Sequence, residues 1–526
     1  MEEQDSSVGV AKSPLSCRQC RRLKRRCDRQ YPCCNLCEQK QLVCDYPHQR
    51  KKRVVRAGKG NHQEFVASTS NSNSSSATVS PQSYDTDTPL SKSQPNSSTK
   101  VNAHHQLAEL SKLNPITASF LDADNVALDQ LETAKIDVTI TKHVADLVGS
   151  VDDIQNAART YWASVHLWMP IVSKIQFRQH LLPRLVAKRA QLFLLILAMK
   201  LLSTPTKTSN SMLYRTVKQL YFDVELAGSI CVMSLQAGTL IAVYELGHGI
   251  YPAAIVSVAH CARIGTLIGV DKALANDLLS QGIPWVELEE RRRLWWAILI
   301  FVNLSCPKQS LVTLDPDPES KLPVDDDDYD NGTSTPGDSV PLRLSSQVHL
   351  GRFARFVHAV PLLSQAIRRS NEDRHSSAQL RRTILSLIHL GETESVEDRI
   401  LFCTLNAVCY LAVFALDRPP RRPNTQQLTV DDIASPETVA AIDHAIRIMT
   451  SEASNHSRPN LSPFVLHMMY RALNVSWRLQ NLGLPGVDVS SNVERLKLGL
   501  KCFQDRWLVA NTYLLLAKRQ EVFSVT

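Results

Sequence analysis

Apolar residues recur at helical spacing through most of the chain after about residue 136. Intervals of three and four residues place the apolar side chains on one face of a helix. Five stretches show this pattern: Val151 to Leu185, Gln191 to Leu202, Leu235 to Leu246, Ala253 to Ile268 and Glu287 to Val302. The pattern predicts a large all-α domain, with helices broken near Pro170 and at the turn formed by residues 247–249.

The second of these stretches is almost entirely apolar. It is only about twelve residues long and contains Lys200, whereas a helix that spans a bilayer needs roughly 20 apolar residues. We therefore expect a buried core helix at this position and no membrane partner.

The fifth stretch starts with acidic residues, which the helix dipole favours in a first turn. Two ion pairs with i,i+4 spacing are expected on this helix, Glu287 with Arg291 and Glu289 with Arg293. A later acidic run, Asp325–Asp328, predicts a solvated loop, because consecutive carboxylates cannot all converge on one cation.

The C-terminal portion is also predicted to be helical. Ser462 and Pro463 fit an N-cap and a first helical residue, and Ser491 with Glu494 fits a capping box. The last helix is expected to run from Val493 to about Phe523.

The N-terminal part has a different composition. Residues 1–13 are polar and are expected to be disordered, as is a linker over residues 61–130. Within residues 61–100, 24 of 40 residues are Ser, Thr, Asn or Pro. That leaves too little apolar content to offset the entropy cost of ordering the chain.

Cysteines dominate the segment between the disordered start and the linker. The spacing C-x2-C-x6-C occurs twice, first at Cys17, Cys20 and Cys27 and then at Cys34, Cys37 and Cys44. About thirty residues cannot bury a core, so a disulfide framework or a metal must hold them together, and zinc is the default ion for thiolate ligands. Zinc is favoured because no apolar secretory segment precedes the cysteines.

Six thiolates can complete two tetrahedral zinc sites only if two of the sulfur atoms bridge both ions. The sequence therefore predicts two Zn2+ per chain. Cys33 is spare and is expected to be a solvent-facing neighbour of the cluster, because using it as a ligand would break the repeated spacing.

Positive charge is concentrated around the same cysteines. Between Lys12 and Arg56 there are 14 Lys and Arg and three acidic residues, a formal charge of +11. The whole chain carries +8, so the remainder carries −3. A basic patch on a zinc scaffold suits the phosphate backbone of double-stranded DNA.

The cysteine segment resembles the fungal Zn2Cys6 transcription factors through CRRLKRRCD and Pro32. The resemblance implies that Cys17 and Cys34 bridge the two zinc ions. It further implies that the residues from Arg18 to Arg26 form a short helix that enters the major groove, usually at a CGG triplet, and that Lys24 reads the bases. The neighbouring arginines are assigned to phosphates or flanking base edges: Arg21, Arg22, Arg25 and Arg26.

A basic tail follows the cysteines. It contains Arg50, Lys51, Lys52 and Arg53, and it is expected to follow the DNA backbone, to act as a nuclear import signal, or both.

Residues 140–335 resemble the middle homology region of the same family. The matching segments are YELGHG at 244–249, ARIGTLIGVDK from residue 262, EERRRLWWAILI at 289–300 and KLPVDDDDYD at 321–330. The predicted fold class is mostly α: a small zinc-stapled DNA-binding cluster, a disordered linker and a large all-α helical domain.

The predicted domains follow from these boundaries. They are a disordered start (1–13), a Zn2Cys6 DNA-binding domain (14–47), a basic tail (48–60), a disordered linker (61–130), an all-α middle homology region (131–335) and a C-terminal helical portion of the regulatory domain (336–526).

The protein is predicted to be a sequence-specific transcription factor that acts on RNA polymerase II genes. It is expected to lie in the nucleus and to contact the transcription machinery. An activator is favoured over a repressor, and regulation of a biosynthetic gene cluster is suggested by the resemblance alone. The alternative is a zinc-cluster protein-interaction cofactor, or a repressor that does not read DNA directly.

An enzyme is not expected. The sequence has no G-x-S-x-G elbow, P-loop, dinucleotide fingerprint or HExxH. His248 and the His260-Cys261 pair are the best candidates for chemistry, but a packing or surface role is favoured for both.

No coiled coil is predicted next to the zinc cluster. Apolar residues between Asp45 and Lys100 are scattered, and prolines at 47, 81, 89 and 95 interrupt any continuous helix. The fragment 1–100 is therefore expected to be a monomer that contacts a single triplet. Any self-association would have to form through the helical domain.

Overall fold

The computed structural model describes residues 16–17, 20–21, 25–30, 33–40, 44, 138–187, 189–305, 316–345, 348–369, 374–393, 396–417, 435–450, 461–481 and 489–525. The chain forms two compact units, residues 1–94 and 95–526. The two segments predicted to be disordered, 1–13 and 61–130, lie outside the described residues, as does the basic tail.

The first unit contains the cysteine segment. Its described helix is α2 (Asn35–Gln39), and Cys20 with Arg21 forms a helical turn. Among the residues of this unit that the structure describes, the buried side chains are cysteines, so thiol groups take the place of a conventional hydrophobic core there.

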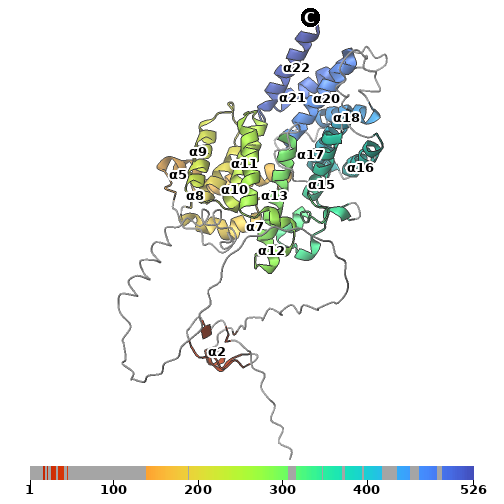
Figure 1. The fold of residues 1–526 in the computed structure, drawn as a ribbon. Helices are drawn as coiled ribbons and strands as arrows, with labels where there is room; N and C mark the ends of the chain where they lie inside the picture. The colour runs from red at the N-terminus through yellow and green to blue at the C-terminus, as the bar shows by residue number, and fades with distance from the viewer. Residues whose placement is uncertain are drawn as a thin grey trace, which may run out of the picture. The chain divides into compact units, whose positions relative to one another are not determined.

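The second unit is built from helices (Figure 1). They are α5 (Lys142–Val148), α6 (Val151–Trp162), α7 (Lys174–Gln176), α8 (Ala190–Ser203), α9 (Met212–Leu226), α10 (Val232–Gly247), α11 (Ala253–Leu267), α12 (Asp277–Ser280), α13 (Trp285–Ser305), α14 (Asp326–Asn331), α15 (Arg352–Arg369), α16 (Arg374–Thr393), α17 (Val396–Leu416), α18 (Pro436–Thr450), α20 (Pro463–Asn481), α21 (Val489–Cys502) and α22 (Val509–Val525). Within the described ranges of this unit, the β pairing is an isolated bridge between Lys321 and Pro341. The predicted mostly α fold class is confirmed.

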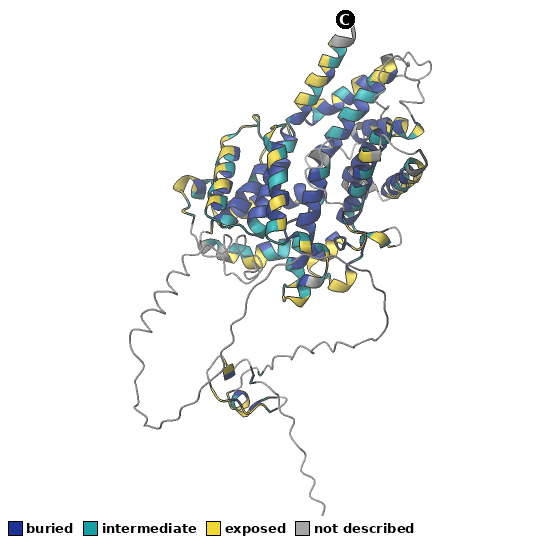
Figure 2. Ribbon diagram, viewed as in Figure 1, coloured by how far each residue is buried: buried dark blue, intermediate teal, exposed yellow. Residues whose placement is uncertain are grey.

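One hydrophobic core runs through the second unit, from Val144 in α5 to Ala517 in α22. Figure 2 shows the buried faces of the helices turned toward one another and the exposed residues on the outer faces. The middle and C-terminal portions expected from the sequence therefore share a core, because helices from both contribute to it.

The apolar stretch at 191–202 forms α8, as predicted. Ten of the eleven residues from Leu192 to Leu202 are buried. The exception is Lys200, whose ammonium donates to the carbonyl of Leu147 at 2.8 Å. Across the described helices, none combines the length and apolarity needed to cross a bilayer.

The helices predicted between Val151 and Leu185 do break near Pro170. α6 begins with a capping box between Ser150 and Asp153. Beyond Pro170 the chain forms only the short helix α7, a π-helical segment over Phe177–Leu181 and a 3-10 segment over Leu182–Ala187.

Two predictions for the C-terminal portion are wrong. α20 begins at Pro463 as expected, but α21 begins at Val489, so Ser491 lies inside the first turn and does not cap it. The single helix expected from residue 493 to 523 is two helices, because the chain turns between α21 and α22 to bury Trp507.

Trp507 joins this turn to the end of α10. Its indole Nε1–H donates to the carbonyl of Leu461 at 2.9 Å, and the ring is fully buried. The ring lies so close to Gly247 that a Cβ at that position would sit 2.1 Å from it. Gly247 is therefore required for the C-terminal turn to pack against α10.

A buried charge network holds the segment after α13 against that helix. Arg293 donates to Glu289 at 3.0 Å, to Asp326 at 2.7 Å and to the carbonyl of Val324 at 2.7 Å. The side chains of Arg293 and Glu289 are both 0% exposed. The guanidinium also lies 4.0 Å from the centroid of the Tyr329 ring.

The predicted solvated acidic loop is therefore wrong in part. Asp325 caps α14 by accepting from the N–H groups of Asp327 and Asp328, and Asp326 is buried against Arg293. The run forms a helix start because a carboxylate at the N-cap satisfies free amide groups there. Asp327 remains exposed.

Candidate metal centre and nucleic-acid interface

The two cysteine repeats fold locally in the same way. The carbonyl of Cys17 accepts from Arg21 N–H at 3.2 Å, and the carbonyl of Cys34 accepts from the N–H groups of Cys37 and Glu38 at 2.9 and 3.0 Å. Each C-x2-C segment therefore wraps into a turn that brings its two thiols to the same side. Asp28 links the repeats, because its carboxylate accepts from Asn35 N–H at 3.2 Å.

The sulfur atoms stand at distances that suit zinc. The separations are 3.8 Å for Cys17 and Cys34, 3.7 Å for Cys17 and Cys37, and 3.6 Å for Cys20 and Cys34. A tetrahedral zinc with Zn–S bonds of about 2.3 Å has neighbouring sulfurs about 3.8 Å apart. The thiols therefore fit the edges of zinc tetrahedra.

The cysteines fall into two sets of four, each with all sulfur atoms within 4.8 Å of one another. One set is Cys17, Cys20, Cys27 and Cys34, and the other is Cys17, Cys34, Cys37 and Cys44. Cys17 and Cys34 belong to both sets. Six thiols thus offer eight coordination positions, and the cluster is capable of binding two zinc ions.

The electrostatics of the cluster make proton loss part of zinc binding. Burial among the other thiols raises the pKa of Cys20 and of Cys37. Zinc binds thiolates, so binding must release these protons. Two amides favour the charged form of sulfur: Cys20 N–H donates to the sulfur of Cys17 and Cys34 N–H donates to that of Cys44, both at 3.3 Å.

Cys33 belongs to neither set of four. Its thiol is half-buried and lies 3.7 Å from the carbonyl oxygen of Cys34. It is a neighbour of the cluster, but it is half-buried and not fully solvent-facing as predicted.

Three of the predicted DNA-contacting residues can be placed. Arg21, Arg25 and Arg26 are exposed beside the cysteines, and Arg25 N–H donates to the carbonyl of Cys20 at 2.9 Å. The remaining predicted contacts lie outside the described residues: Arg22, Lys24, Arg50, Lys51, Lys52 and Arg53. The linking role of Asp28 was not predicted from the sequence. The signal that could have indicated it is its position directly after the ligand candidate Cys27.

The two histidines of the second unit that were considered as catalytic candidates pack against neighbouring side chains. His248 stacks on Tyr244 with ring centroids 3.9 Å apart, and its Nδ1–H donates to the Tyr244 carbonyl at 2.8 Å. Burial lowers the pKa of His248 to about 4. His260 lies 3.3 Å from the carboxylate of Glu225.

Comparisons with known proteins match both units. Residues 15–53 match the fungal Zn(2)-Cys(6) binuclear cluster domain, and residues 158–390 match the fungal specific transcription factor domain. Transcription factor BOA15 of Botryotinia fuckeliana (strain B05.10) is 38% identical over 152 residues, which cover 28% of this chain and 85% of that relative. No solved structure matches.

Proposed function

Because this chain belongs to the fungal Zn2Cys6 transcription factor family, we propose that it regulates RNA polymerase II genes in the nucleus by reading CGG-type triplets through a binuclear zinc cluster. The observation that carries the proposal is the pair of four-thiol sets that share two sulfurs, with exposed arginines beside them.

Under this proposal the six repeated cysteines are the zinc ligands. Cys17 and Cys34 bridge the two ions, Cys20 and Cys27 complete one site, and Cys37 and Cys44 complete the other. The distances between sulfurs and the membership of the two sets support this assignment. Zinc supplies the folding energy of a unit whose buried side chains are thiols.

Base reading is assigned to Lys24, and phosphate contacts to the surrounding arginines and the basic tail. The exposure of Arg21, Arg25 and Arg26 supports the phosphate assignment. A lysine that donates to guanine O6 and N7 contributes about 1–3 kcal/mol of discrimination against a wrong base.

The test is binding of the full chain to a CGG-containing duplex and to random duplex over a range of salt concentrations. Lys24→Ala should weaken binding to the CGG site and flatten the preference between the two duplexes. The matched control, Lys51→Ala, should weaken both equally and lower the salt slope by about one. Equal losses on both duplexes for Lys24→Ala would show that another residue reads the bases.

The other parts of the proposal rest on the family. As a member of this family, the protein is assigned contact with the transcription machinery, activation of transcription and regulation of a biosynthetic gene cluster. Self-association, if it occurs, is assigned to the helical unit. A chain that binds zinc but has no preference for any duplex would instead fit a zinc-cluster interaction cofactor.

A further inference from the structure

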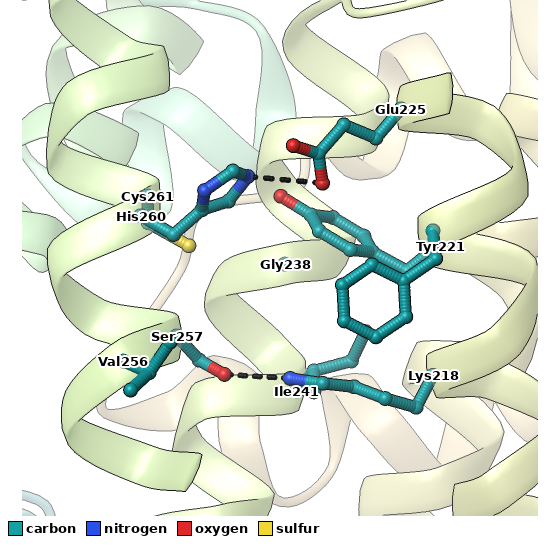
Figure 3. Close-up of a pocket in the computed structure, with 10 residues that line it drawn as sticks. Lys218, Tyr221, Glu225, Gly238, Ile241, Val256, Ser257, His260 and Cys261 are labelled. Atoms are coloured by element: carbon teal, nitrogen blue, oxygen red, sulfur yellow. Dashed lines mark hydrogen bonds and ion pairs between the residues drawn. The ribbon is translucent and has the colours of Figure 1, made fainter. Parts of the chain in front are cut away.

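A cavity of about 120 Å3 lies between α9, α10 and α11 in the helical unit (Figure 3). Its walls are largely apolar and include Ile241 from α10 and Val256 from α11. Val256 and Phe222 are both more than half exposed and stand at the rim. These rim residues leave the cavity open to solvent, so a small molecule can enter it.

One end of the cavity is formed by Lys218. Its ammonium donates to Ser257 Oγ at 2.7 Å and to Glu245 Oε1 at 2.8 Å. The Glu245 side chain is fully buried and also accepts from the Tyr214 hydroxyl at 2.8 Å. The positive charge of Lys218 is therefore balanced inside the protein.

The other end is formed by Glu225 and His260, where a carboxylate oxygen and the ring Nε2 lie 3.3 Å apart. Figure 3 shows the Tyr221 hydroxyl directed toward this pair, and no dashed line reaches it. The Tyr221 ring meets the His260 ring edge-on with centroids 5.9 Å apart. Tyr221 as a residue is 9% exposed. Its hydroxyl has no hydrogen-bond partner among the described residues, and it is not one of the fully buried atoms, so it is accessible from the cavity.

Gly238 keeps the cavity open. A Cβ at this position would lie 2.9 Å from the hydroxyl and the ring of Tyr221. Any other residue would push the Tyr221 ring away from α10 and into the hollow. A glycine in the middle of a helix costs about 1 kcal/mol relative to alanine, and here that cost preserves the space beside Tyr221.

We propose that this cavity binds a small neutral molecule, a single ring that carries a hydroxyl group. The ring would fill the apolar space, and the hydroxyl would accept from Tyr221 and donate to the Glu225 carboxylate. A closed cavity of about 150 Å3 accepts benzene. This cavity is somewhat smaller but opens at its rim, so one ring is the largest ligand that it suits.

The charge balance defines the class of ligand. Lys218 is paired with Glu245, so the lining has no free cation for an anionic ligand, and the Glu225 carboxylate beside His260 can accept a hydrogen bond from a neutral hydroxyl. A hydroxyl satisfies the Tyr221 group without breaking either pair. A ligand hydroxyl can form a hydrogen bond with Tyr221 that a hydrocarbon cannot form, and this gives the site its selectivity for a polar ring over a hydrocarbon.

The experiment is a 19F NMR titration of the full chain with 4-fluorophenol, with fluorobenzene and 4-fluorobenzoate as comparisons. We expect saturable binding of 4-fluorophenol that is tighter than that of either comparison compound. Tyr221→Phe removes only the hydroxyl and should weaken 4-fluorophenol about fivefold. It should leave fluorobenzene unchanged. Tyr470→Phe, the same chemical change far from the cavity in α20, is the matched control and should alter neither.

A second variant tests the space rather than the hydroxyl. Gly238→Ala should weaken every ring compound alike, because the displaced Tyr221 ring occupies the cavity, while far-UV circular dichroism shows the helices intact. Three results would overturn the proposal: no saturable binding, tighter binding of 4-fluorobenzoate than of 4-fluorophenol, or equal affinity of the wild type and Tyr221→Phe. These variants do not change the zinc unit. A negative result for ligand binding is therefore distinguishable from a negative result for DNA binding.

Discussion

Replacing Arg293 by methionine should destabilise the helical unit far more than the same change at Arg291. The two arginines lie on one helix, and each faces a glutamate four residues earlier. Arg293 and Glu289 are 0% exposed, whereas Arg291 is 20% and Glu287 40% exposed. The pairs therefore have the same sequence spacing and different surroundings.

The size of the effect follows from what each variant leaves behind. Arg293→Met would leave the Asp326 carboxylate buried with only the N–H of Phe353 as a donor, at 2.9 Å. Glu289 would keep Arg292 and the Val324 N–H. Breaking a buried pair by removing one partner costs about 3–5 kcal/mol, whereas an exposed i,i+4 pair contributes about 0.5 kcal/mol.

The assay is urea unfolding of the full chain followed by far-UV circular dichroism at pH 7. We expect a loss of about 3–5 kcal/mol in the free energy of unfolding for Arg293→Met and less than 1 kcal/mol for Arg291→Met. Arg293→Lys should recover only part of the loss, because an ammonium cannot reproduce the fork of the guanidinium. Losses within 1 kcal/mol of each other for the two methionine variants would refute the argument.

Three further predictions concern the cluster, a buried histidine and oligomeric state. Cys34→Ala should reduce the zinc content of both sites, whereas Cys33→Ala should retain two zinc ions per chain. Zinc content is measured by elemental analysis, and loss of metal in the Cys33 variant would contradict the ligand assignment. Because burial lowers the pKa of His248 to about 4 while the unfolded value is near 6.5, the unfolded state binds more protons between these values. Stability should fall by about 2 kcal/mol from pH 7 to pH 5, and His248→Gln should lack this part of the pH dependence in urea unfolding. Fragment 1–100 should sediment as a monomer with and without a duplex carrying two triplets, and a stable dimer in free solution would reveal a missed dimerisation element.

Local patterns in the sequence predicted the helices well. The apolar stretch that forms α8, the start of α20 at Pro463 and the break near Pro170 all follow from spacing and from proline geometry. The cysteine repeat likewise predicted a two-zinc cluster, since ligand number and spacing are local properties.

Long-range contacts were not accessible in the same way. The two i,i+4 pairs on α13 look equivalent in sequence, and only the fold shows that residues 324–326 return to bury one of them. The acidic run was predicted to be solvated because its partner, Arg293, lies more than thirty residues earlier. The last helix was predicted as one segment because periodicity does not report that Trp507 must turn inward to reach Gly247.

The contact between Trp507 and Gly247 affects how deletion experiments on this protein should be interpreted. Regions that stimulate transcription are commonly sought by shortening a chain from its C-terminus and measuring reporter output. Here, removal of residues beyond about 500 would take away a tryptophan that is fully buried against α10. The shortened chain would expose apolar surface on α10 and lose folded protein in the cell. Loss of reporter expression after such a deletion would then reflect a lower amount of folded protein. Regions that stimulate transcription are therefore better located in this chain by point substitutions at exposed positions.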